Sequence, residues 1–153
     1  MEVEKLFQEK HIMMNLERET REEVITALFD KLYASNSVKE SFLENVLKRE
    51  KVYPTGLKIK NFEIAIPHTE GVHVNESTIA IATLKTPVSF QCMEDPEEEV
   101  QAKIVMMMAL KDGHNHLQMI SRIVKMFQKQ EVLSGLEHAE TEHEIINLIQ
   151  QYL

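Results

Sequence analysis

The sequence feature that most constrains the fold is an unbroken apolar segment late in the chain. After Lys103, seven consecutive apolar residues extend to Leu110. A strand with one face in water alternates polar and apolar residues, whereas a continuous apolar run is typical of a strand that is buried on both faces. We therefore expect an internal strand at residues 103–110, with helices covering both of its sides.

The remaining strands are short and lie on both sides of this segment in the sequence. Apolar and β-branched clusters predict them at residues 12–16, 62–66, 78–84 and 88–90. The sequence Tyr-Pro-Thr-Gly predicts a turn at residues 53–56.

Capping boxes, in which Ser or Thr is followed three residues later by Glu, predict the starts of three helices. They begin near Thr20, Ser37 and Thr141. A short helical turn is predicted at residues 131–136, ending near Gly135.

A further helix is predicted at residues 116–129, after the break at Gly113. Its predicted inner face consists of Leu117, Ile120, Val124 and Phe127. Strands that alternate with helices predict an α/β fold, in which a mixed sheet is sandwiched between helices. A chain of this length fits a single domain, residues 1–153.

The composition argues against several classes of protein. The formal net charge is −8, which disfavours nucleic-acid binding because that binding needs Lys and Arg to neutralise phosphates. No apolar run approaches the ~20 residues that cross a bilayer, and the acidic N-terminus lacks a signal core. A single cysteine, Cys92, excludes an internal disulfide. We expect a cytoplasmic protein without nucleic-acid partners or membrane insertion; its oligomeric state is left open.

The tripeptide Ile66-Pro67-His68 places a histidine where an apolar strand ends. Proline offers no backbone N–H to a sheet, so it ends strand pairing and turns the chain outward. A neutral imidazole, with a pKa of roughly 6.5, is a good nucleophile at physiological pH. His68 is therefore a candidate to accept a phosphoryl or acyl group and pass it on.

The seven histidines divide into two groups. Those expected to be solvated or capping residues are His11, His138 and His143. Those in two windows beside a strand end or a helix start are His68, His73, His114 and His116. Because active sites of open α/β sheets gather at the carboxyl ends of strands, two adjacent strands would bring His68 and His116 together.

Paired imidazoles suit phosphoryl transfer, in which one is the nucleophile and a second imidazole or an arginine stabilises the charge on the oxygens. His116 also lies near a predicted helix start, which favours an anion. The rival interpretation is a zinc site, because residues 68–73 and 114–116 offer nitrogen and oxygen ligands. The first window does not match a strong metal-binding signature.

Two segments resemble the active-site region of a known family. Residues 49–57 (REKVYPTGL), followed after a short gap by residues 64–68 (IAIPH), resemble the enzyme IIA proteins of the bacterial sugar phosphotransferase system, fructose–mannitol superfamily. Residues 116–120 (HLQMI) resemble that family's second histidine segment. The similarity extends from about Arg21 to Leu153, and the combination of PTGL with IPH is most similar to the galactitol-type subgroup.

The resemblance implies a phosphohistidine carrier. His68 would accept phosphate from the phosphocarrier protein HPr and pass it to a cysteine of a separate enzyme IIB. From there the phosphate would reach a sugar that enters through the membrane enzyme IIC. Arg49 and His116 match positions around the phosphohistidine. The family fold is a mixed sheet sandwiched by helices, and the resemblance implies no nucleotide, metal or other cofactor because the energy is already stored in the P–N bond.

The sequence departs from the family pattern at two positions near the site. The family commonly has a small residue after Pro-His, whereas this chain has Thr69, whose hydroxyl would contact the phosphoryl group or fill space. The second segment often reads Asn-x-His; here Asn115 directly precedes His116, and His114 takes the earlier place. We favour His116, because the residues after it keep the family register.

Two other functions remain open from the sequence. One is a regulatory phosphoacceptor module of the same fold, which signals to a regulator instead of a transporter. The other is a metal-dependent hydrolase. Cys92 does not resemble the phosphocysteine loop of an enzyme IIB, so we expect a donor subunit without a fused enzyme IIB.

Overall fold

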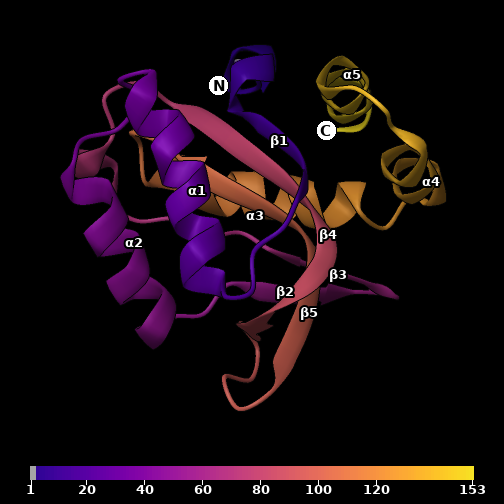
Figure 1. Cartoon of the computed structure of the whole chain (residues 1–153), viewed down its shortest axis with the longest axis horizontal. Coiled ribbons are helices and arrows are strands. Elements are labelled where there is room, and N and C mark those ends of the chain that lie inside the picture. The colour runs from indigo at the N-terminus through magenta and orange to yellow at the C-terminus, as the bar shows by residue number, and fades with distance from the viewer. Residues whose placement is uncertain (1–2) are drawn as a thin grey trace.

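The computed structural model describes residues 3–153, which form a five-stranded sheet between two layers of helices (Figure 1). The strands are β1 (Ile12–Leu16), β2 (Gly56–Ile59), β3 (Phe62–Ala65), β4 (Thr78–Gln91) and β5 (Glu99–Ala109). The helices are α1 (Arg21–Ala34), α2 (Ser41–Val52), α3 (His114–Met126), α4 (Gln130–His138) and α5 (Glu142–Tyr152). Short 3₁₀ turns lie at η1 (Val3–Leu6), η2 (Glu9–His11) and η3 (Gly71–His73).

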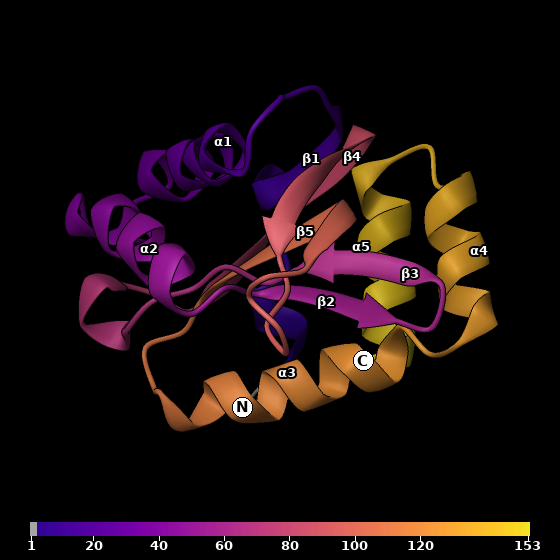
Figure 2. The same cartoon turned by 90° about the horizontal axis from the view of Figure 1, so that it is seen from below.

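The sheet is mixed, with the strand order β1-β4-β5-β3-β2. The pairs β1–β4 and β3–β5 are parallel, whereas β4–β5 and β2–β3 are antiparallel. Helices α1 and α2 cover one face, and α3, α4 and α5 cover the other (Figure 2). The predicted α/β sandwich with a mixed sheet is therefore confirmed.

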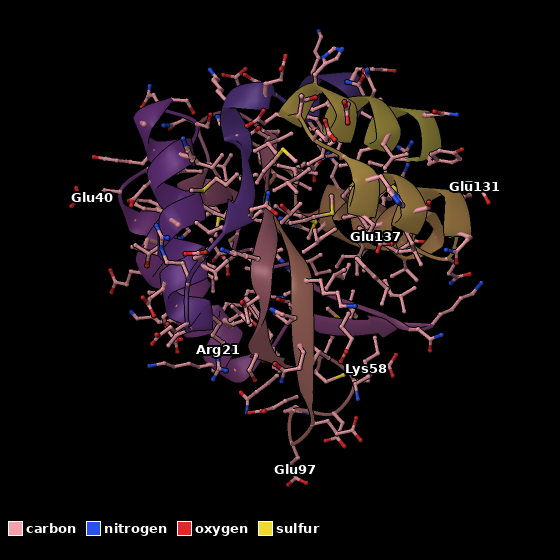
Figure 3. The ribbon with its side chains drawn as sticks, turned by 45° about the vertical axis from the view of Figure 1, so that its right-hand side comes forward. Arg21, Glu40, Lys58, Glu97, Glu131 and Glu137 are labelled. Atoms are coloured by element: carbon pink, nitrogen blue, oxygen red, sulfur yellow. The ribbon has the colours of Figure 1, made fainter. Side chains whose placement is uncertain are left out.

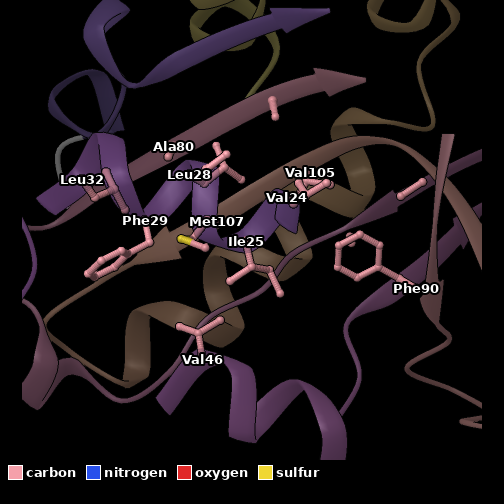
Figure 4. Packing of buried hydrophobic residues seen from close by; sticks show 14 of the residues in the cluster. Val24, Ile25, Leu28, Phe29, Leu32, Val46, Ala80, Phe90, Val105 and Met107 are labelled. Atoms are coloured by element: carbon pink, nitrogen blue, oxygen red, sulfur yellow. The ribbon is translucent and has the colours of Figure 1, made fainter. Parts of the chain in front are cut away.

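Strand β5 is buried on both faces, as its apolar run predicts. Val105 and Met107 pack with the apolar faces of α1 and α2, including Val24 and Leu28 (Figure 4). The alternating side chains Ile104, Met106 and Met108 pack in the second core, under α3 and α5. One strand thus contributes to both hydrophobic layers, because successive side chains point to opposite faces of a sheet.

Two of the three capping boxes are confirmed. The hydroxyls of Thr20 and Thr141 accept hydrogen bonds from the backbone N–H groups of Glu23 and Glu144. The third is wrong, because α2 begins four residues after Ser37, without a side-chain cap.

Tertiary pairing explains the late start of α2. Val38 pairs with Val74, and the carbonyl of Ser37 accepts hydrogen bonds from Asn75 and Glu76. The backbone around residue 37 is thus held in extended contact with the loop before β4, which is incompatible with a helical turn.

The strand predictions need two corrections. Residues 78–84 and 88–90 belong to one long strand, β4, whose pairing with β5 shifts register between Thr83 and Val88. Strand β2 was not predicted; it begins at Gly56, at the end of the predicted turn, and pairs with β3. Residues 94–98 form an exposed acidic loop between β4 and β5, and Glu97 lies at the tip of this hairpin (Figure 3).

Helices α3 and α4 also differ from their predictions. Helix α4 continues through Gly135 to His138. Helix α3 begins two residues earlier than expected, and its predicted inner face is wrong at one position: Leu117 is 77% exposed, whereas Phe127 is buried and Ile120 and Val124 are partly buried against the core. The buried residues are His116, Met119, Ile123 and Met126. This set has the same helical spacing, and its apolar side chains fill the layer above Met106 and Met108.

His11 contradicts its prediction as a surface residue, because its side chain is fully buried. Its Nδ1 lies 2.9 Å from the hydroxyl of Thr78, and its Nε2 lies 2.7 Å from the hydroxyl of Ser35. These two hydroxyls provide hydrogen-bond partners for both ring nitrogens, so the ring can be buried although its sequence context predicted a solvated residue. His138 and His143 are exposed, as expected.

None of the helices within residues 3–153 has the length and apolar character that crossing a membrane requires.

Gly71 permits a close backbone contact beside the site. A Cβ atom at this position would overlap the carbonyl group of Lys111, in the segment that leads into α3. The absence of a side chain therefore lets the loop that follows His68 pack directly against the loop that precedes His116.

We predict that Gly71→Ala lowers the free energy of unfolding by about 1–3 kcal/mol, because the overlapping atoms are backbone and must move together. Gly113→Ala is the matched control: no atom lies within 4 Å of its added Cβ. We expect a change within about 1 kcal/mol for this control. Urea unfolding measures both variants, and equal stability of the two would contradict the packing role of Gly71.

Candidate active site

Parallel pairing of β3 with β5 brings the two histidine segments to the same edge of the sheet. Ile64 pairs with Ile104 and Ala65 with Val105. Beyond β3, the N–H of Met108 donates to the carbonyl of Pro67 at 3.0 Å, so the chain stays beside β5 as far as His68. The strands are therefore adjacent, as the sequence interpretation required.

His68 is held in one orientation by its own backbone. Its Nδ1 donates a hydrogen bond to the carbonyl of Ile66 at 2.8 Å. Because a carbonyl only accepts, Nδ1 carries the proton and Nε2 of the neutral ring keeps its lone pair. The side chain is only 6% exposed. Nε2 is thus the ring nitrogen available for nucleophilic attack.

His116 stacks on His68, with ring centroids 4.9 Å apart and an angle of 27° between the ring planes. It comes from the first turn of α3, where its backbone N–H donates a hydrogen bond to the carbonyl of Gly113 at 3.2 Å. Its Nε2 is buried and has no hydrogen-bond partner among the described residues. A buried polar atom without a partner is costly in a native fold, so its presence requires an explanation such as a catalytic role or a bound water or ion.

Arg49, near the end of α2, supplies the fixed positive charge at the site. Its guanidinium carbon lies 5.3 Å from the ring centroid of Tyr53. Within residues 3–153, its buried Nε also has no hydrogen-bond partner. Arginine cannot lose its proton in a protein, so Nε is a donor without an acceptor. Arg49 and His116 therefore each present an unused polar atom.

These groups line a cavity of about 660 Å³. Arg49, His68, Thr69 and His116 line it, and exposed apolar side chains form part of its wall, among them Tyr53, Val72 and Leu117. Thr69 is buried beside His68. His114 is exposed and is not part of the wall, so of the two neighbouring histidines it is His116 that faces the cavity.

Burial lowers the pKa of both histidines. The pKa of His68 falls from 6.5 to about 4, chiefly because burial disfavours the charged ring; the hydrogen bond to Ile66 opposes this, and His116 and Arg49 add to it. The pKa of His116 is also lowered by burial first, against a hydrogen bond to Gly113, with Arg49 adding to the shift. His68 is therefore neutral at physiological pH.

The structure does not support a zinc site in the part of the chain that is described. No group of three or more His, Cys, Asp or Glu side chains there is arranged to hold a metal ion. His73, a candidate ligand, points elsewhere: its Nδ1 lies 2.7 Å from the hydroxyl of Ser41.

The sequence interpretation missed Glu50, which is buried and accepts two hydrogen bonds from Thr55, a residue that lines the cavity. Burial raises its pKa, which the two Thr55 hydrogen bonds and the positive charges of Arg21 and Arg49 partly offset. The one feature of the sequence that could have pointed to Glu50 is its position directly after Arg49, a residue already expected at the site.

The arrangement defines an α/β domain with a neutral nucleophilic histidine in a cavity that favours an anion. Consistent with this class, residues 5–152 match the family model described as "Phosphoenolpyruvate-dependent sugar phosphotransferase system, EIIA 2". The chain therefore belongs to the enzyme IIA proteins of that system. Enzyme IIA components are phosphotransferases that work through a phosphohistidine intermediate.

Two curated relatives from Escherichia coli K12 illustrate the similarity. The chain is 28% identical over 143 residues to the 2-O-alpha-mannosyl-D-glycerate-specific EIIABC component, a match that covers 90% of this chain and 21% of that protein. It is 25% identical over 116 residues to the galactitol-specific EIIA component, covering 76% of this chain and 77% of the relative. The chain thus spans about a fifth of the first relative's length.

Solved structures share the fold. The mannitol enzyme IIA of Escherichia coli, in its complex with phosphorylated mannitol enzyme IIB, superposes with a TM-score of 0.77 at 22% sequence identity. The match covers 95% of this chain and 97% of that one. The predicted mannitol-type enzyme IIA fold is confirmed.

The pKa of His68 predicts a pH dependence of stability. The unfolded chain holds a proton on this histidine up to a pKa of about 6.5, whereas the folded protein loses it above about 4. The stability gained from the neutral ring is thus fully present above pH 6.5 and is lost as the pH falls toward 4.

We expect the wild type to lose about 2–3 kcal/mol more unfolding free energy than His68→Gln when the pH drops from 7.5 to 4.5. Urea unfolding of both proteins at the two pH values measures the difference. Equal losses in the two proteins would show that His68 has an ordinary pKa.

Proposed function

We propose that His68 is the phosphorylated residue of this enzyme IIA domain. The single observation that carries this proposal is the hydrogen bond from Nδ1 to the carbonyl of Ile66, which leaves Nε2 as the nitrogen with the lone pair. The stacked ring of His116 and the unused Nε of Arg49 support it, because both lie at the cavity into which a phosphoryl group would enter.

The proposed reaction consists of two in-line transfers. The Nε2 lone pair of His68 attacks the phosphorus of phospho-HPr, and the P–N bond to the donor breaks, returning its electron pair to the donor imidazole. The phosphoryl group then passes to a cysteine thiolate of enzyme IIB, which attacks the phosphorus while the P–Nε2 bond breaks and its electrons return to His68. No net proton, oxidant or reductant is needed.

Arg49, His116 and Thr69 have supporting roles in this proposal. The three equatorial oxygens of the transferred group carry the negative charge, so positioned donors lower the barrier. Arg49 supplies a permanent charge. His116 supplies a ring nitrogen that is otherwise unpaired, and the hydroxyl of buried Thr69 completes the wall beside His68.

We propose HPr and enzyme IIB as the direct partners, in the cytoplasm, with enzyme IIC reached only through enzyme IIB. The exposed apolar side chains Tyr53, Val72 and Leu117 at the cavity support a docking surface for both. The solved complex of mannitol enzyme IIA with phosphorylated enzyme IIB supports the second partner. A galactitol-like polyol is the proposed substrate class, on the basis of the relative that the chain matches over most of its length.

We predict that phospho-HPr transfers one acid-labile phosphate to the wild type and none to His68→Ala, because the variant lacks the nucleophile. Mass spectrometry at neutral pH measures the added phosphate. His138→Ala, which removes an exposed histidine from α4, is the matched control and should accept phosphate normally. Phosphate on His68→Ala would reject the proposal, whereas transfer to the protein but to no enzyme IIB would favour a regulatory module.

We predict that His116→Ala still accepts phosphate on His68, about 100-fold more slowly, because one stabilising donor is lost from the transition state. Rapid-quench measurement of phosphate uptake gives the rate, and phosphopeptide mapping gives the site. A variant that reacts as fast as the wild type would remove His116 from the mechanism.

A further inference from the structure

A line of hydrogen bonds runs from a buried carboxylate to the candidate nucleophile. The two oxygens of Glu50 each accept from Thr55: Oε2 from the backbone N–H and Oε1 from the hydroxyl, both at 2.8 Å. The carbonyl of Thr55 accepts from the N–H of Ile66 at 3.2 Å. The carbonyl of Ile66 accepts from Nδ1 of His68 at 2.8 Å.

Glu50 is placed to act as a rigid anchor. It is 5% exposed, at the end of α2, and both hydrogen bonds of its carboxylate are made to Thr55. Hydrogen bonds to a charged acceptor are stronger than neutral ones, and a buried partner cannot be replaced by water. Thr55 is therefore held at two atoms, its amide and its hydroxyl.

The far side of Thr55 is also fixed. The next residue, Gly56, begins β2, pairs with Ala65 of β3, and accepts a hydrogen bond from the N–H of Met93. A side chain at Gly56 would collide with Val100 and with the backbone of Gln91. The turn at Thr55 and Gly56 is thus held on one side by the Glu50 carboxylate and on the other by the β4–β5 hairpin.

We infer that Glu50 is a positioning residue for His68, acting through Thr55 and Ile66. By fixing the Thr55 turn, it fixes the backbone of Ile66, and hence the direction of the carbonyl that accepts the hydrogen bond from Nδ1–H. This carbonyl selects the tautomer in which Nε2 has the lone pair. The inference deepens the proposed function and depends on it for its catalytic meaning.

The inference also explains why a carboxylate stands at this buried position. Burial alone disfavours its charge, and raises its pKa, so an apolar side chain would cost less to bury. In the same pose, a neutral amide would place its NH₂ group against one of the two Thr55 donors, because only one of its two terminal atoms is an acceptor. A carboxylate offers an acceptor at both terminal atoms.

The test combines Glu50→Gln with a readout that does not depend on phosphate. Ring ¹⁵N chemical shifts of His68 at neutral pH distinguish the nitrogen with the proton from the nitrogen with the lone pair. We expect a single Nδ1–H tautomer in the wild type and a mixture of tautomers in Glu50→Gln. We also expect phosphate uptake from phospho-HPr to slow about tenfold, because the nucleophile is less well oriented.

Three controls separate positioning from general destabilisation. Val46→Ala truncates a fully buried side chain of the same helix, outside the line of hydrogen bonds, and should leave the ring signals unchanged. Thr55→Ser keeps both donors to Glu50 and should keep the wild-type tautomer. Thr55→Val loses the hydroxyl donor and should give a mixture, which tests the inference even where Glu50→Gln fails to fold.

Wild-type ring signals in Glu50→Gln, or in Thr55→Val, would overturn the inference. So would a change in Val46→Ala as large as that in Glu50→Gln, because it would reveal a merely structural effect. The proposed function fails separately: if the wild type takes no phosphate, or His68→Ala takes it normally, the phosphocarrier role is rejected while the ring signals still decide whether Glu50 orients His68.

Discussion

The parallel pairing of β3 with β5 is the constraint on which the site depends. Parallel neighbours end at the same edge of a sheet, so the chain that leaves β3 through Pro67 and the chain that leaves β5 toward α3 emerge side by side. An antiparallel pair would send them to opposite edges. The stacking of His68 on His116, from segments 48 positions apart in sequence (116 minus 68), follows directly from this arrangement.

The apolar environment of β5 then sets the chemistry. The same two hydrophobic layers that bury the strand on both faces also withdraw His68 from water at its end. Desolvation keeps the ring neutral, which a nucleophile requires, and Arg49 adds to this effect. The nearby charge therefore both suppresses protonation of His68 and favours the anionic group that the ring would receive.

Polar contacts of the site are supplied mainly by backbone atoms. Nδ1 of His68 donates a hydrogen bond to the carbonyl of Ile66, and the Thr55 turn that accepts from the Ile66 N–H is held by one buried carboxylate, Glu50. Backbone acceptors have few rotational alternatives, so they hold a ring more rigidly than flexible side chains do. The open part of the cavity, by contrast, carries exposed apolar groups such as Leu117, which suits contacts that must form and break.

Much of the fold was predictable because short-range sequence patterns determine it. The apolar run before Leu110 predicted a doubly buried strand, and the capping boxes at Thr20 and Thr141 predicted two helix starts, since both signals act over a few residues. The Pro67-His68 pair likewise indicated a histidine at a strand end. Strand β2 was missed because its pairing with β3, not its own sequence, makes it a strand.

Other features were decided only when distant segments met. Pairing of Val38 with Val74 overrode the capping box at Ser37, because an extended backbone bridge and a helical turn exclude each other. The packing of α3 placed His116 inward and Leu117 outward, which helical periodicity alone did not decide. The sequence by itself determined which histidines and which arginine are candidates for the site; tertiary structure determined which of them meet, because burial and orientation depend on the neighbours that a side chain acquires when the chain folds.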